Sequence, residues 1–123
     1  MLPIKLVNAN DPKRSVMTWG VIDTGADECA VPHEFAPIIG HIWTAGEETT
    51  IRSGCGIQVG FIHMSTIKIY KPNERRPAFT IENAPIAFMP NLKVVLLGVK
   101  SFLSRFVLNI DYPRYSFSLK LPK

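Results

Sequence analysis

The sequence predicts an all-β domain, built as a small closed barrel or a sandwich. The chain carries 10 prolines and 8 glycines in 123 residues, spaced so that few segments could form a long helix. Between them lie short runs rich in Val, Ile, Thr, Phe and Tyr, which suit a half-buried pleated surface. A chain of 123 residues fits one domain, since domains commonly have about 100–150 residues, and no linker or internal repeat divides it.

Nine strands are expected. In residues 65–70, Ile67 and Ile69 alternate with polar neighbours, and residues 115–121 alternate in the same way, as in a strand with one face in water. The other strands are inferred from their composition and from the turn residues that bound them. The expected strands are residues 2–7, 15–22, 29–31, 49–53, 57–70, 79–88, 94–97, 106–110 and 115–121.

One short helix is expected near the C-terminus, over residues 98–106. Its apolar residues fall on one stripe at helical spacing. They are Val99, Phe102, Leu103 and Phe106. A single helical turn within residues 33–39 is a weaker expectation.

Composition narrows the class of function. The net charge is +4, from 14 basic and 10 acidic side chains, and the basic residues are scattered rather than clustered with aromatics. We therefore expect no nucleic-acid partner. Cys29 and Cys55 are the only cysteines and have no metal-ligand spacing, so we expect no zinc site. We expect two free thiols, with a disulfide as the alternative.

The N-terminus indicates no export. Its first ten residues are too few and too polar for a signal peptide, and no apolar run approaches the roughly 20 residues that span a membrane. We therefore expect a soluble, cytoplasmic protein without a membrane partner. This expectation fails if the chain is a domain cut from a longer protein.

The chemically informative stretch is an apolar strand that runs directly into a tight turn, Val21-Ile22-Asp23-Thr24-Gly25. In a catalytic turn, Asp23 would present its carboxylate to a water molecule. Gly25 would let the backbone fold back, so that its amide could donate to that carboxylate. Thr24 would tie the turn to a neighbouring backbone. The same tripeptide also occurs in ordinary turns at strand ends, so the flanking residues decide the interpretation.

Those flanks resemble the retroviral-type aspartic peptidases, the retropepsins and their relatives. Their hallmark is two apolar residues, then Asp-Thr-Gly-Ala, often followed by Asp, as in Ala26-Asp27 here. A second mark is two apolar residues and a glycine before a C-terminal helix, matched by Leu96-Leu97-Gly98.

A third mark is a glycine-tipped hairpin, the flap, that covers the cleft. Residues 49–60 match it, with Gly54, Cys55 and Gly56 at the tip. A plain hairpin with a glycine turn is the alternative for this segment. The marks occur in the family's order and cover nearly the whole chain.

The resemblance implies a closed barrel of the retropepsin type, with a flap hairpin and one short C-terminal helix. It also implies an endopeptidase that hydrolyses an extended peptide or unfolded protein without a metal or other cofactor. The implied catalytic residues are Asp23, Thr24 and Gly25. The implied substrate-binding residues are Ala26, Asp27, Gly54, Cys55, Gly56 and Leu97.

A single Asp-Thr-Gly implies a homodimer. The chemistry needs two carboxylates about 3 Å apart that share one proton, so the second must be Asp23 of another copy related by a two-fold axis. The resemblance puts the dimer sheet at the termini, residues 2–7 and 115–121. One position departs from the family: the arginine that often pairs with the residue matching Asp27 is replaced by Val99.

Two other readings stay open. The chain could be a non-catalytic dimerisation or peptide-binding domain with the same fold, or a peptidase domain of a larger protein.

Several other residues are expected to have structural roles. The three histidines, His33, His41 and His63, form no cluster by sequence and are expected at the surface or in packing. We expect Cys29 to pack as a small hydrophobe and Cys55 to be an exposed thiol. Asp111 should cap a turn, and Trp19 and Trp43 should line the core or a subsite.

Overall fold

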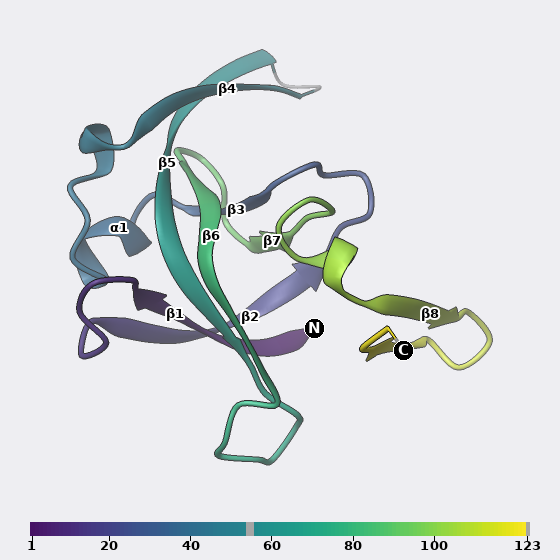
Figure 1. The fold of residues 1–123 in the computed structure, drawn as a ribbon. Coiled ribbons are helices and arrows are strands. Elements are labelled where there is room, and N and C mark those ends of the chain that lie inside the picture. The colour runs from purple at the N-terminus through teal and green to yellow at the C-terminus, as the bar shows by residue number, and fades with distance from the viewer. Residues whose placement is uncertain (54–55, 123) are drawn as a thin grey trace.

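The computed structural model describes residues 1–53 and 56–122. It is all-β, with 53% of the residues in strands and 8% in helices, and six of the described strands close into a barrel (Figure 1). The predicted fold class and barrel closure are therefore confirmed. Gly54 and Cys55, assigned to the hairpin tip, lie outside the described residues.

Every strand expected from the sequence is present within two residues of its predicted bounds. The strands of the described chain are β1 (Leu2–Asn8), β2 (Ser15–Ile22), β3 (Cys29–Pro32), β4 (Glu47–Ser53), β5 (Gly56–Ile69), β6 (Phe79–Met89), β7 (Val95–Leu97), β8 (Val107–Asp111) and β9 (Ser116–Lys120).

The barrel closes because β1 pairs with strands on both of its edges. The strand order is β1-β2-β7-β3-β6-β5, and β5 pairs with β1 in turn, while β4 continues the sheet beyond β5 as an edge strand. Ile4 lies opposite Thr18 of β2 and Ile69 of β5. From Ile4 to Val7 both edges of β1 are occupied, so most of the segment 2–7 has no free edge for the dimer sheet predicted there.

Three short helical segments connect the strands: α1 (Phe35–Ile38), η1 (Trp43–Ala45) and η2 (Leu103–Arg105), the last two being 3₁₀ turns. The helical turn expected within residues 33–39 is α1. None of the helices in the described ranges is long and apolar enough to cross a membrane.

The continuous helix predicted over residues 98–106 is wrong, since only the 3₁₀ turn η2 forms there. The amides of Leu103 and Ser104 donate to the carbonyls of Gly98 and Val99, five residues back, which makes a wide turn instead of an α-helical ladder. The Ser104 hydroxyl also donates to the Lys100 carbonyl at 2.7 Å, a local bond that competes with helix formation. The apolar spacing was nevertheless informative, because Phe102 is fully buried.

The barrel interior is filled by aliphatic side chains together with two phenylalanines. Phe88 and Phe102 are 0% exposed. Around them pack Ile4, Leu6, Ile67, Ile81, Ile86 and Leu97. On the outer face of β3, β6 and β7 lies a second cluster, in which Ala30, Ala87 and Met89 are buried and Ile62, Leu92 and Leu96 are partly buried.

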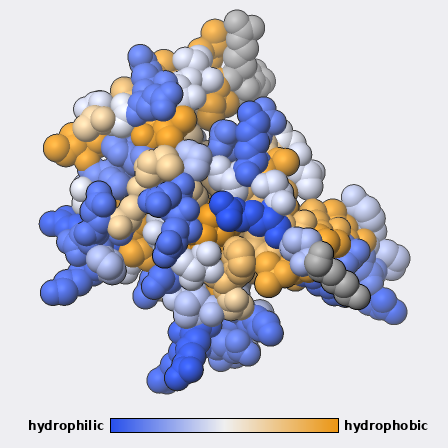
Figure 2. Space-filling model, viewed as in Figure 1, coloured by the Kyte–Doolittle hydropathy of each residue, from blue (hydrophilic) through white to orange (hydrophobic). Residues whose placement is uncertain are grey.

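The last two strands form a separate hairpin. Within the described chain β8 and β9 pair only with each other, and the hairpin extends from the side of the barrel near the N-terminus (Figure 1). Hydrophobic residues gather on this side of the surface (Figure 2). Ile110 is 50% exposed and Phe117 is 37% exposed, so the hairpin presents apolar side chains to solvent.

Candidate active site

The Asp-Thr-Gly turn is anchored to β7. β2 runs parallel to β7, with Ile22 beside Leu97, and the amide of Asp23 donates to the carbonyl of Leu97 at 3.1 Å. The amide of Ala26 donates back to the carbonyl of Asp23 at 3.3 Å and closes the turn. The end of a barrel strand therefore fixes the backbone position of Asp23.

The carboxylate of Asp23 accepts a hydrogen bond from the amide of Gly25 at 3.0 Å, the contact expected from the sequence. Asp23 is half-buried, whereas Thr24 and Gly25 are exposed. Gly25 does not have a positive φ, and a Cβ there would meet only the Asp23 Oδ1 at 3.4 Å, so this turn does not need the conformational freedom of glycine. Among the described residues Thr24 has no side-chain hydrogen bond, and its bracing role stays a prediction.

The segment after β7 packs directly against the turn. The amides of Val99 and Lys100 donate to the carbonyls of Ala26 and Asp27 at 2.9 and 2.8 Å. A Cβ on Gly98 would overlap the carbonyl oxygen of Glu28 and lie 2.9 Å from that of Ala26. Glycine is required at this position because two backbones are in contact there, which gives a physical reason for the Leu-Leu-Gly mark.

Glu28 strengthens the same junction. Its Oε2 accepts a hydrogen bond from the Ser101 hydroxyl at 3.1 Å. Asp27 is exposed, and no described residue forms an ion pair with it.

Leu97 does not have the exposure expected of a substrate-binding residue. It is 1% exposed and belongs to the barrel core, whereas its neighbour Leu96 is half-buried in the outer cluster. Side chains alternate between the faces of a strand, so Leu97 points into the core and Leu96 faces away from it.

Gly56, the one predicted tip residue that the structure describes, lies at the start of β5. β4 pairs with β5 from Glu47–Ile62 to Ser53–Gly56, and the outer edge of β4 has no neighbouring strand among the described ones. Gly56 is exposed and has a φ of 112°, a conformation that favours glycine.

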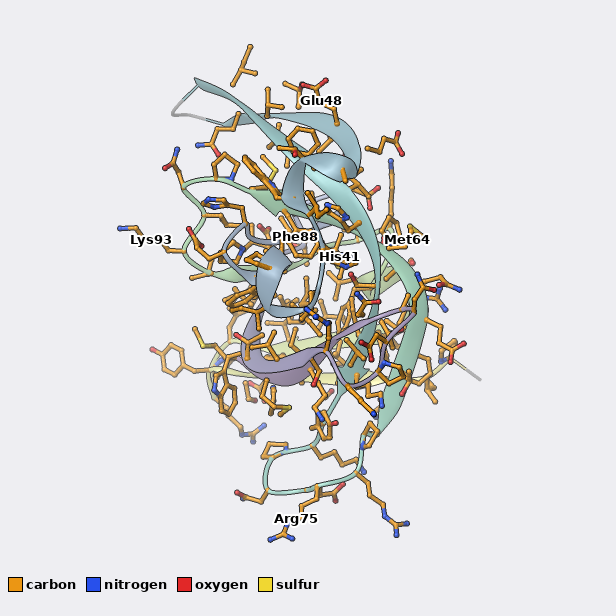
Figure 3. All side chains as sticks on the ribbon, turned by 90° about the vertical axis from the view of Figure 1, so that its left-hand side faces the viewer. His41, Glu48, Met64, Arg75, Phe88 and Lys93 are labelled. Carbon is orange, nitrogen blue, oxygen red and sulfur yellow. The ribbon has the colours of Figure 1, made fainter. Side chains whose placement is uncertain are left out.

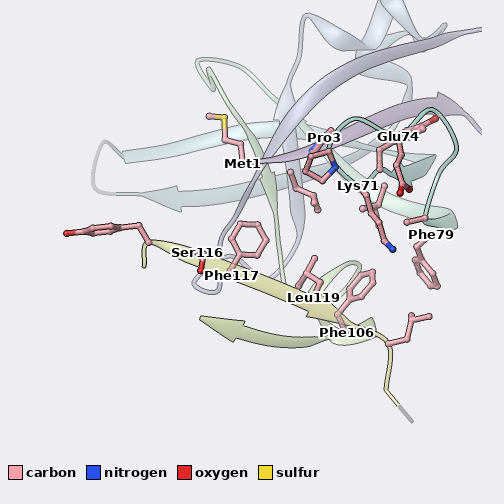
Figure 4. Close-up of a pocket in the computed structure, with 16 residues that line it drawn as sticks. Met1, Pro3, Lys71, Glu74, Phe79, Phe106, Ser116, Phe117 and Leu119 are labelled. Carbon is pink, nitrogen blue, oxygen red and sulfur yellow. The ribbon is translucent and has the colours of Figure 1, made fainter. Parts of the chain in front are cut away.

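Two apolar grooves lie beside the C-terminal hairpin. The larger has a volume of about 670 Å³ and separates β9 from the N-terminus and the β5–β6 loop (Figure 4). The smaller, of about 330 Å³, is lined by Thr24 and Val21 on the barrel side and by Ile110 and Phe117 on the hairpin side. The exposed apex of the Asp-Thr-Gly turn is therefore continuous with the apolar surface of the hairpin.

The sequence missed the stacking of two histidines, and the structure contradicts one of the two roles expected for Trp19, that of a core residue. His41 and His63 stack with ring centroids 4.5 Å apart, and His33 lies 4.9 Å from Trp43. No sequence spacing could signal this, because the three histidines lie on separate elements. Trp19 is 56% exposed and is not a core residue.

Cys29 packs in the core as expected. It is a free thiol, 1% exposed, and its burial raises the pKa to about 11. The described residues include no group of three or more His, Cys, Asp or Glu side chains arranged to hold a metal ion.

Comparisons of the chain with protein-family models, with curated proteins and with solved structures found no match.

Proposed function

We propose that the chain is an aspartic endopeptidase of the retroviral type. The observation that carries the proposal is the Asp23 turn: a half-buried carboxylate at the end of a barrel strand, oriented by the Gly25 amide and supported by the Leu96-Leu97-Gly98 segment. An ordinary strand-end turn would not need the second backbone support. The junction holds the carboxylate at a fixed place and leaves the adjacent Thr24 and Gly25 exposed.

The proposed reaction requires two such carboxylates. Two carboxylates about 3 Å apart cannot both ionise, so one remains protonated, as is established for aspartic proteases. The ionised group takes a proton from water while the protonated group polarises the scissile carbonyl. The pair titrates as a unit. Since the chain holds one Asp-Thr-Gly, the second carboxylate would be Asp23 of another copy.

The C-terminal hairpin is the surface we propose for this dimer. An isolated two-stranded hairpin is marginally stable in water, yet this one exposes Ile110, Tyr115 and Phe117. The smaller groove connects these residues to Thr24, so a partner seated on the hairpin would also approach the turn. Replacing Ile110 with Lys should therefore shift the protein toward monomer in sedimentation equilibrium and lower cleavage in proportion.

An extended peptide is the substrate that the proposed site would accept. The hairpin β4–β5 would act as the flap, and the free edge of β4 could pair with a substrate strand by β-augmentation. The outer cluster containing Leu96, Leu92 and Ile62 would contact apolar substrate side chains. Ala26 and Asp27 would border the peptide, together with Gly56.

The test compares cleavage of an unfolded protein by the wild type and by Asp23→Asn from pH 4 to 8. Asp11→Asn is the matched control, because Asp11 lies in the β1–β2 turn and pairs with Arg14 at 3.7 Å, outside the site. We expect cleavage by the wild type and the control and none by Asp23→Asn. Absence of cleavage by a protein shown to be dimeric would favour the non-catalytic binding domain. Equal cleavage by Asp23→Asn would exclude Asp23 as the catalyst.

A further inference from the structure

Two of the three histidines, His41 and His63, stack at the base of the β4–β5 hairpin, and the third, His33, packs against Trp43. The rings of His41 and His63 stack at 4.5 Å with an interplanar angle of 22°. The ring of Phe88 meets both imidazoles edge-on, at 5.7 and 5.3 Å, and Figure 3 shows His41 beside Phe88. The stacked pair therefore lies against the barrel core.

This cluster attaches η1 to the barrel. The Nε2–H of His63 donates to the carbonyl oxygen of Trp43 at 2.8 Å, and a carbonyl can only accept, so this contact defines the tautomer. The Nε1–H of Trp43 donates in turn to the carbonyl of Phe88 at 2.7 Å. A Cβ on Gly46 would lie 2.8 Å from His63 Nε2. Because η1 leads through Gly46 into β4, His63 helps to hold the start of the hairpin's first strand.

The surroundings of His41 favour its neutral form. Burial, and secondarily the neighbouring His63, lower the pKa of His41 below its usual value. The Nε2 of His41 also lies 3.2 Å from the hydroxyl oxygen of Ser65. Two charged rings in stacking contact would repel each other.

The elements around the pair carry charged side chains of both signs. Glu34 contacts His33 at 3.1 Å, the Arg14 side chain lies at Gly40, and Glu47 lies opposite Ile62 in the hairpin. No ion pair in the described part of the chain includes His41 or His63. Phe88, which packs against both rings from β6, has no titratable side chain.

We infer that the stacked His41–His63 pair is an acid-sensitive latch that fastens the base of the β4–β5 hairpin. Protonation of both rings forces them apart, breaks the contact of His63 with Trp43 and loosens η1 together with β4. The folded-state pKa of His41 lies below its unfolded value, so the open state binds the proton more readily. The latched arrangement therefore loses stability as the pH falls below about 6.5. The inference holds whether or not the chain cleaves peptides.

The first test is amide hydrogen exchange at pH 7.5 and pH 5.0, corrected for the intrinsic effect of pH on the exchange rate. His41→Phe keeps a stacked ring without a charge, and His63→Gln keeps a neutral donor toward Trp43. His33→Gln is the matched control, because it removes the histidine outside the stacked pair. In the wild type and in His33→Gln we expect protection of the β4 and β5 amides of the hairpin to fall by about threefold or more at pH 5.0. In His41→Phe the protection should stay within twofold. In His63→Gln, where His41 remains buried, the loss should be smaller than in the wild type but not absent.

The second test needs no substitution. Titration of the histidine ring protons of the wild type by NMR should place the midpoint of His41 below 6.5. A midpoint of 6.5 or higher would overturn the inference, as would the same loss of hairpin protection in His41→Phe as in the wild type. If the variants do not fold, the titration of the wild type decides.

Discussion

Replacing Gly98 with alanine tests whether the backbone contact behind the Asp23 turn is as close as the structure has it. The new Cβ would overlap the Glu28 carbonyl oxygen, lie 2.5 Å from its carbonyl carbon and lie 2.9 Å from the Ala26 oxygen. All three atoms belong to the backbone, so no side chain can rotate away. The two backbone segments, residues 26–28 and the segment around Gly98, must therefore move apart.

The cost has two parts. Overpacking at a buried position costs about 1–3 kcal/mol. Separation also weakens the hydrogen bonds of Val99 and Lys100 to the turn, each contributing about 0.5–1.5 kcal/mol. We therefore expect Gly98→Ala to lower the free energy of unfolding by about 2–6 kcal/mol, a large fraction of the roughly 5–15 kcal/mol typical of a domain.

The assay is denaturant unfolding followed by tryptophan fluorescence. Gly25→Ala is the matched control, because its Cβ would make only an ordinary contact of 3.4 Å. The control should lose less than about 1 kcal/mol. If Gly98→Ala is as stable as wild type, or if both variants lose the same stability, the close approach of the two backbones is not present as described.

Two further predictions follow from burial. Leu97→Ala should lower the free energy of unfolding by about 2–5 kcal/mol because Leu97 is 1% exposed. Leu96→Ala should lower it less and should instead alter the preferred cleavage sites. Unfolding curves check the stabilities, and mass-spectrometric mapping of the products checks the cleavage sites. In a Cys55→Ser variant, Cys29 should not react with a thiol reagent at pH 8 until the protein unfolds, since its pKa is raised to about 11. The same shift makes the free energy of unfolding fall as the pH rises through 9.0, the ordinary pKa of a cysteine thiol, because the unfolded thiol ionises first. Rapid labelling of Cys29 in the native protein would contradict this account.

The strands were predictable because their residues carry a local signal. Short apolar runs bounded by proline and glycine gave all nine within two residues, and no partner was needed to recognise them. The segment 98–106 shows where local signals mislead. Its apolar spacing correctly indicated burial of Phe102. The amides of Val99 and Lys100, however, donate to the Asp23 turn, and the residues that follow form a wide turn.

The choice between Leu96 and Leu97 could not be made from the sequence. Both are leucines on one short strand, and alternation shows only that they face opposite sides. The core side is decided by the neighbours of β7, which are β2 and β3 from an earlier part of the chain.

The sequence by itself determined the strands, the apolar run into Asp23 and the contact of Gly25 with the carboxylate, since each depends on residues within a few positions of one another. Only the tertiary structure decided that β1 closes the barrel, that the hairpin β8–β9 pairs with no other described strand and that His41 stacks on His63. These features join residues far apart in the chain. Their contacts depend on how the barrel closes and how its core packs, and no local pattern of residues predicts that arrangement.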